Sequence, residues 1–289
     1  MEVLNLGKRH FFDLSPALMT GEHIKLITLK LSLNKIGDDG VKSLSSALMN
    51  ENNDKVIALY LSDNNIGDDG VSLLSTALMN ENNKLTTLDV RFNNIGVDGI
   101  KSLSTALMNE NNKVMLLNLS NNNIGDEGAR CLSTALMNEN NQVTTLVLYN
   151  SNIGDDGVSA LSAALMNKNN KVTRIHLALN HIGTQGLAGL LKTLRFSVVS
   201  YLDILTQDSL DYDVQQVLED FTDAFNKKVP RLVCLASACT ISRIGDQSPH
   251  FRELSSDILI RVAQTLGWLL EGWFIDYQAT IRMLEEHAD

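Results

Sequence analysis

The chain repeats a unit of about 29 residues, and no other feature of its sequence constrains the fold as strongly. An Ile-Gly pair returns at residues 36, 66, 95, 124, 153 and 182, at intervals of 30, 29, 29, 29 and 29 residues. Each pair ends the template apolar-x-x-Leu-x-Leu-x-x-Asn-x-Ile-Gly, as in LITLKLSLNKIG (26–37) and VIALYLSDNNIG (56–67). A unit of this length has room for one short strand and one helix, which cannot bury their apolar sides alone. The sequence therefore predicts a stack of units that share one continuous core.

The template predicts a strand that ends in a turn. In Leu-x-Leu the leucines point inward and the intervening residue points outward. The asparagine that follows is expected to be buried, because its side chain can bond turn backbone that no neighbouring strand satisfies. The fifth copy has Ser151 at this position. Since serine has less reach, we expect that turn to be bridged by water or reshaped.

A helix follows each turn. In the first copy, GDDGVKSLSSALMNENN (37–53) places Val41, Leu44 and Leu48 on one face, at the spacing of an amphipathic helix. Asp38 or Asp39 is expected to cap this helix and to complement its positive end. The phrase ALMNENN recurs almost unchanged in the units, so it is interpreted as scaffold that closes the helix and returns the chain to the next strand.

The paired aspartates after each turn do not predict a calcium ladder. The third copy has Val97 at the first of these positions, and the sixth has Thr184 and Gln185 at both. Calcium needs several oxygen ligands at one site. We therefore predict no metal site and no cofactor.

Over residues 24–194 the template resembles the leucine-rich repeat, and its helical unit is similar to the ribonuclease-inhibitor-like subclass. The resemblance implies an α/β fold, a right-handed solenoid (horseshoe) with parallel concave strands and convex helices. Near-identical, Asn-rich units followed by a helical tail also resemble leucine-rich-repeat effectors of intracellular bacterial pathogens. That resemblance implies a soluble protein of the bacterial cytoplasm that is secreted into the host-cell cytosol.

Three segments are expected. Residues 1–23 contain VLNL and SPALMTGEH, which echo a unit and predict an N-terminal capping repeat. Residues 24–205 hold the six full copies and a degenerate seventh strand in VVSYLDIL, with Leu202 and Ile204 inward. Residues 206–289 break the period, and their apolar residues at helical spacing predict a C-terminal helical region packed on the solenoid end.

Composition narrows the function further. The formal net charge is −10, from 24 basic and 34 acidic residues, which argues against nucleic acid or an anionic membrane as partner. The three cysteines have no zinc-site spacing and are expected to be buried, reduced thiols. No apolar stretch is long enough to span a bilayer, and the N-terminus lacks the pattern of a secretory signal.

The outward positions of the strands vary from copy to copy, whereas the rest of each unit is nearly copied. The scaffold therefore does not dictate them. They include three of the 15 aromatic residues, and tyrosine and arginine are residue types that dominate binding energy at interfaces. The candidate protein-binding residues are Lys30, Tyr60, Asp89, Arg91, Phe92, Asn118, Tyr149, Arg174, His176 and His181.

These residues predict non-catalytic binding of one protein partner by a chain that is monomeric when free. The partner would be a host protein or another bacterial effector, with enzymes among the candidates. Resemblance to ribonuclease inhibitor favours occlusion of the partner's active site. Three alternatives stay open: an adaptor whose C-terminal helices recruit host machinery such as a ubiquitin ligase, an enzyme with Cys234 or Cys239 as nucleophile, and a purely structural array.

Overall fold

The computed structural model describes residues 2–5, 26–51, 56–194, 197–205, 207, 215, 219, 222 and 226. Its strands form one open, eight-stranded parallel sheet, in which they lie in the order in which they follow in the chain. The strands are β1 (Glu2–Asn5), β2 (Leu26–Lys30), β3 (Ala58–Tyr60), β4 (Thr87–Asp89), β5 (Leu116–Asn118), β6 (Thr145–Val147), β7 (Arg174–His176) and β8 (Tyr201–Asp203).

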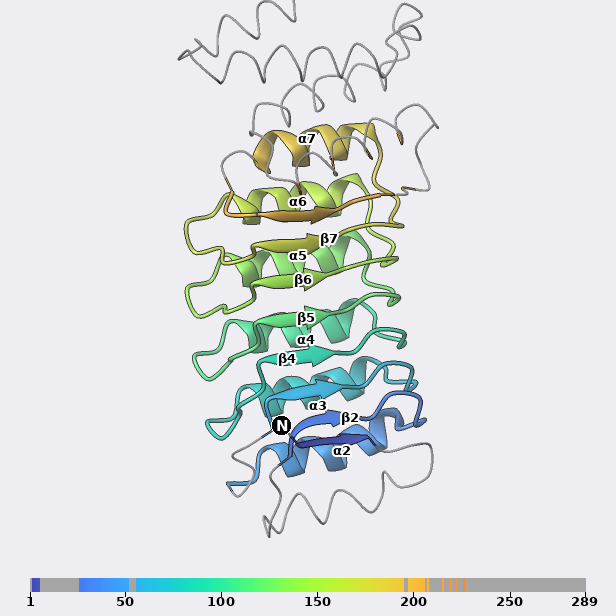
Figure 1. Cartoon of the computed structure of the whole chain (residues 1–289), viewed down its shortest axis with the longest axis vertical. Coiled ribbons are helices and arrows are strands. Elements are labelled where there is room, and N and C mark those ends of the chain that lie inside the picture. Colours follow the sequence, from blue (N-terminus) through green and yellow to red (C-terminus); the bar gives the residue numbers. More distant parts are fainter. Residues whose placement is uncertain are drawn as a thin grey trace, which may run out of the picture.

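A helix follows each strand from β2 to β7, and the helices lie together on one side of the sheet (Figure 1). They are α2 (Gly37–Leu48), α3 (Asp68–Leu78), α4 (Val97–Leu107), α5 (Gly125–Leu136), α6 (Asp155–Leu165) and α7 (Thr184–Leu194). The predicted repeat architecture, with parallel strands on one side and helices on the other, is confirmed. None of the described helices is long and apolar enough to cross a membrane.

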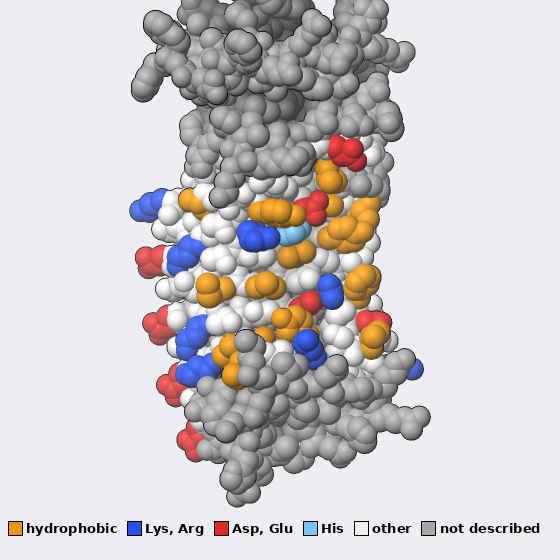
Figure 2. Space-filling model, in the orientation of Figure 1, with side chains coloured by type: hydrophobic (Ala, Val, Ile, Leu, Met, Phe, Trp, Pro, Cys, Tyr) orange, Lys and Arg blue, Asp and Glu red, His pale blue; other side chains and the backbone are white. Residues whose placement is uncertain are grey.

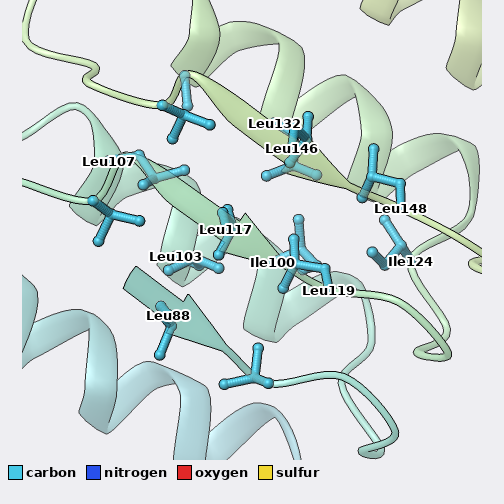
Figure 3. Packing of buried hydrophobic residues seen from close by; sticks show 14 of the residues in the cluster. Leu88, Ile100, Leu103, Leu107, Leu117, Leu119, Ile124, Leu132, Leu146 and Leu148 are labelled. Atoms are coloured by element: carbon cyan, nitrogen blue, oxygen red, sulfur yellow. The ribbon is translucent and has the colours of Figure 1, made fainter. Parts of the chain in front are cut away.

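The core lies between these two layers. Equivalent residues of consecutive units are paired in the sheet, so Leu88, Leu117 and Leu146 stand in one row. These inward leucines meet helix residues such as Leu103 and Leu132, and all five are buried (Figure 3). Complete burial of a leucine side chain contributes about 1.5–3 kcal/mol. The repeated inward leucines therefore stabilise every unit in the same way.

A ladder of buried asparagines joins consecutive units, except that the fifth unit has Ser151 at this position. Asn93 accepts with its Oδ1 from the backbone N–H of Asn64 and of Ile66, both at 3.0 Å. Its Nδ2 donates to the carbonyl of Leu61 in the preceding unit at 3.0 Å and to that of Val90 at 2.9 Å. The predicted role of the template asparagine is confirmed, and the structure adds that its bonds cross between units.

The ALMNENN phrase carries a second ladder. Asn111 donates from its Nδ2 to the carbonyl of Met79, which ends the preceding helix, at 2.9 Å. The next residue, Asn112, accepts with its Oδ1 from the Val114 N–H at 3.2 Å and starts the return to the strand. Glu110, which lies between Asn109 and Asn111, is exposed. The phrase is thus a helix stop and a link between units at once, which explains why its asparagines vary so little.

The expectation that Asp38 or Asp39 caps its own helix is wrong. No side chain makes a capping bond to α2, and the Asp38 Oδ1 instead accepts from the Gly67 N–H in the next unit, at 2.8 Å. Asp68 does the same for Gly96, at 2.6 Å. Stacking sets each carboxylate against the first turn of the following helix, where it satisfies an N–H that has no partner inside that helix.

The seventh unit has other residues where the template has its asparagine. The degenerate strand expected after the sixth copy is β8; Leu202 within it and Ile204 directly after it are fully buried. Gln207 replaces the ladder asparagine, and its Oε1 accepts from the Ile182 N–H at 3.4 Å. Asn226 binds the edge strand through both backbone groups of Leu202, at 2.9 and 2.7 Å. Apart from β1 and the single residues given above, the predicted segments 1–23 and 206–289 lie outside the described residues.

Candidate functional site

The outward side chains of the strands and of the residues that follow them form one surface, termed the strand face here. Register between the strands aligns its residues in rows. The central row consists of Lys30, Tyr60, Asp89, Asn118, Val147, His176 and Asp203. Neighbouring residues of a row are about 4.8 Å apart in a parallel sheet, so one partner segment can contact several units. Figure 2 shows hydrophobic side chains spread over this face, with single basic side chains and one histidine between them.

The predicted site residues differ in their exposure. Exposed on the strand face are Lys30, Arg91, Phe92, Tyr149 and Arg174. Partly buried there are Tyr60, Asn118 and His176, and buried is Asp89. The exposed His181 lies beyond the end of its strand, in the turn between β7 and α7. The structure therefore brings nine of the ten residues onto one face and sets His181 at its margin.

Asp89 supports a neighbouring cation and presents little of itself to a partner. It is only 5% exposed. Its Oδ2 lies 3.5 Å from the Arg91 Nε, and its Oδ1 accepts from the Arg91 backbone N–H at 3.2 Å. Burial raises the pKa of Asp89, and the two interactions with Arg91 oppose this shift. The pair fixes the Arg91 side chain, which is 48% exposed on the strand face.

A cluster on β7 and β8 combines four side chains that a partner can contact. The Arg174 guanidinium carbon lies 4.8 Å from the centre of the Tyr201 ring, a cation–π contact. The His176 ring lies 5.0 Å from the same ring, and its Nδ1 is 3.3 Å from the Asp203 Oδ2. That carboxylate favours the tautomer with a proton on Nδ1. Tyr201 and Asp203 were not among the predicted site residues, because the degenerate seventh unit was treated as a cap.

One row of the strand face has a left-handed backbone conformation. It follows the strands and consists of Leu33, Asp63, Phe92, Asn121, Asn150 and Leu179, with φ between 48° and 64°. Aspartate and asparagine tolerate this conformation, whereas in bulky residues it is uncommon and costs about 1 kcal/mol or more. Leu33 and Phe92 are nonetheless each 53% exposed, so little burial offsets the strain. The row therefore presents apolar side chains where the backbone favours polar ones.

Two further exposed apolar residues lie just before the strands. Ile57 is 40% exposed and Met115 is 48% exposed. Both occupy the template position directly after the first apolar residue, which the sequence-based set omitted. Their alternation with Thr86 and Thr144 in the same position was the signal that could have identified them.

Two features of the described residues bear on catalysis. They contain no group of three or more His, Cys, Asp or Glu side chains that could hold a metal ion. Cys131, on α5, is partly buried, and desolvation raises the pKa of its thiol, which disfavours the reactive thiolate. The candidate nucleophiles Cys234 and Cys239 lie outside the described residues.

The comparison with protein families agrees with this architecture. The family described as "Leucine Rich repeat" matches residues 22–45, 52–75, 81–104, 110–133, 139–162 and 168–191. Among solved structures, an internalin from Listeria monocytogenes is similar, with 23% sequence identity and a TM-score of 0.42. The similarity covers 68% of this chain and 52% of that one, so the chain spans about half the length of the internalin chain. No curated protein matches the chain.

Proposed function

Residues 22–191 belong to the leucine-rich-repeat family, and on that premise we propose that the chain is a non-catalytic binding protein that grips one protein partner with its strand face. The carrying observation is the exposure of Phe92 and Tyr149, at 53% and 36%, on a face where neither serves the core. Aromatic side chains of this kind provide large contact area at interfaces and cluster among the residues that dominate binding energy.

The surroundings of these two aromatics suit an interface. Arg91, 48% exposed at its side chain, lies next to Phe92 and is oriented by Asp89. Exposed apolar residues such as Met115 extend the surface towards the start of the strands. A protein interface of standard size covers about 800 Å² on each partner, and concave arrays of repeats offer such surfaces.

Occlusion is the favoured mechanism within this proposal. The asparagine ladders hold consecutive units at several points, so the face is organised before a partner arrives and little ordering is needed on binding. A face that is pre-organised in this way is well suited to cover a functional surface of the partner, such as an enzyme's active site. We extend the proposal, on the strength of the effector resemblance, to a monomeric protein secreted from a bacterium into the host-cell cytosol, with a host protein or another effector as partner.

The test is co-purification of partners with the tagged full-length chain from bacterial and eukaryotic lysates, followed by affinity measurement. The double variant Phe92→Ala, Tyr149→Ala is expected to lose at least about tenfold in affinity. The matched control is Val97→Ala, Met166→Ala, which removes two exposed apolar side chains, 36% and 47% exposed, at helix ends. If the strand-face variant stays within about threefold of wild type, or if the control loses as much, the strand face is not the binding site.

A truncation separates occlusion from the adaptor alternative. A chain that ends after residue 230 keeps Gln207 and Asn226, whose side chains bind the backbone at Ile182 and Leu202. An occluding inhibitor would keep both its binding and its effect after this truncation. An adaptor would keep its binding and lose its effect.

A further inference from the structure

Arg174, the first residue of β7, is exposed on the strand face and has no acidic partner among the described residues. The other exposed arginines of the described chain differ in this respect. The Arg91 Nε lies 3.5 Å from the Asp89 carboxylate. The Arg130 Nε lies 3.0 Å from the Glu127 carboxylate. The Arg174 guanidinium therefore keeps its N–H donors available, and its planar fork fits a carboxylate through two parallel hydrogen bonds.

The Tyr201 ring holds this guanidinium in place without occupying its donors. The guanidinium carbon lies over the ring, 4.8 Å from its centre. The register of the sheet sets this contact, because Arg174 of β7 is paired directly with Tyr201 of β8. A guanidinium stacked on an aromatic face leaves the N–H groups along its edge free to bind an anion. It also has less side-chain freedom to lose when the anion arrives.

The carboxylate of the same cluster, Asp203, is bonded to a histidine and not to Arg174. Its Oδ2 lies 3.3 Å from the His176 Nδ1, and its side chain is 28% exposed. His176 and Asp203 are paired in register, two residues along their strands from Arg174 and Tyr201. The cluster therefore engages its own anion and leaves its cation unpaired.

Charge is distributed unevenly between the strand face and the helices. The helices lie on the other side of the sheet (Figure 1), and their exposed acidic residues are Asp39, Asp69, Asp98, Glu127 and Asp156. The charged residues of the strand face from β2 to β8 are Lys30, Arg91, Arg174, Asp63, Asp89 and Asp203. All three cations of this set are exposed, whereas only Asp63 is exposed among the acids. Because charges more than about 8 Å apart are largely screened at physiological salt, an anionic group can approach this face although the chain has a net charge of −10.

We infer that the end of the strand face formed by β7 and β8 is a subsite for a carboxylate in an acidic segment of the protein partner. Arg174 binds the carboxylate, and Tyr201 is a positioning residue that holds the guanidinium. That the segment belongs to a protein partner rests on the proposed function. The binding of a carboxylate by Arg174 does not, and it can be tested without the partner.

The probe is acetylated hexaglutamate, titrated into the full-length chain and followed by the NMR shifts of the β7 and β8 amides. We expect saturable binding that weakens as the salt concentration rises, because an exposed ion pair is screened. Arg174→Gln should weaken the affinity at least about fivefold, since it removes both hydrogen bonds to the charged acceptor. Arg91→Gln is the matched control. It removes an exposed arginine that Asp89 already pairs, and it should change the affinity by less than about twofold.

Two variants of Tyr201 separate positioning from folding. Tyr201→Phe keeps the ring face and should bind hexaglutamate as the wild type does. Tyr201→Leu removes the ring and should weaken binding about two- to fivefold. Should Tyr201→Leu fail to fold, Arg174→Gln still decides the matter, because Arg174 is exposed and serves no part of the core.

The inference is overturned if hexaglutamate does not bind, if hexaglutamine binds equally well, or if Arg91→Gln loses as much affinity as Arg174→Gln. A hexaglutamine peptide with one phosphoserine that binds more tightly than hexaglutamate would overturn the assignment to a carboxylate. Failure of this test leaves the strand-face proposal intact, since that proposal depends on the affinity of the Phe92 and Tyr149 variants for the co-purified partner.

Discussion

Replacement of Asp68 by alanine tests whether the first aspartate of a unit holds the next unit. Its Oδ1 accepts from the Gly96 N–H at 2.6 Å, and Gly96 precedes the first residue of α4. The adjacent Asp69 lies in the same first turn of α3 and is exposed. The pair Asp68→Ala and Asp69→Ala therefore removes the same carboxylate from neighbouring positions, and the two variants differ in the bond between units.

The expected magnitude follows from the geometry. Loss of an N-cap side chain costs about 0.5–2 kcal/mol, and a hydrogen bond to a charged acceptor contributes about 1.5–3 kcal/mol. Gly96 is partly buried, so water replaces part of the lost bond. We expect Asp68→Ala to lower the free energy of unfolding by about 1.5 kcal/mol. Asp69→Ala should cost about 0.3–0.5 kcal/mol, since it loses only a favourable interaction with the helix dipole.

Urea unfolding followed by far-ultraviolet circular dichroism measures both values, and hydrogen exchange shows where protection is lost. Asp68→Ala should weaken the start of α4 and leave the start of α3 unchanged. Gly96 should also take a positive φ, as Gly125 does in the unit that follows Val97, which stands in place of the aspartate. Equal losses for the two variants, or loss of protection at α3 in place of α4, would refute the argument and restore the simpler idea of a cap on the same helix.

Three further predictions concern the ladder, the core and a buried charge. Asn93→Ala should lower the free energy of unfolding in urea by about 3 kcal/mol, because it leaves several buried backbone groups without a partner. Replacement of the exposed Asn94 by alanine should lower it by under about 0.5 kcal/mol. Leu117→Ala should cost about 3 kcal/mol, and Leu116→Ala, which changes the outward neighbour, should cost under about 1 kcal/mol while weakening partner binding. Burial raises the pKa of Asp89, so the folded state disfavours its charged form and its contribution to stability falls as the pH rises through that raised pKa. The stability of Asp89→Asn relative to wild type, measured by urea unfolding across pH, should therefore improve from acid to neutral pH; an unchanged difference would contradict this.

The repeat predicted most of the fold because each of its signals is local. Alternating leucines identify a strand, and helical spacing identifies the buried helix face, without reference to any other unit. The direction of the polar bonds could not be predicted in this way. Asp38 lies in the first turn of its own helix, and only the stacking distance between units decides that its carboxylate reaches Gly67 of the next unit. Gln207 was missed for a related reason, since the seventh unit departs from the template in every residue type except its inward apolar ones.

The candidate site was predicted from variation between copies, and the structure shows what such variation measures. A position is copied when its side chain bonds or packs against two units, as Asn111 does, and it varies when stacking does not depend on it. Freedom from stacking is not the same as access to a partner. Asp89 and Ser120 vary freely in the alignment of the copies and yet are only 5% and 4% exposed.

Backbone strain distinguishes the accessible positions that we propose bind a partner from those that only vary. Among the left-handed residues after the strands, asparagine and aspartate need no explanation, because they adopt this conformation at little cost. Phe92 costs the fold free energy there, and with 53% of its surface exposed it regains only part of that cost through packing. Under the proposed function, a contact with the partner accounts for a residue that the scaffold neither requires nor favours.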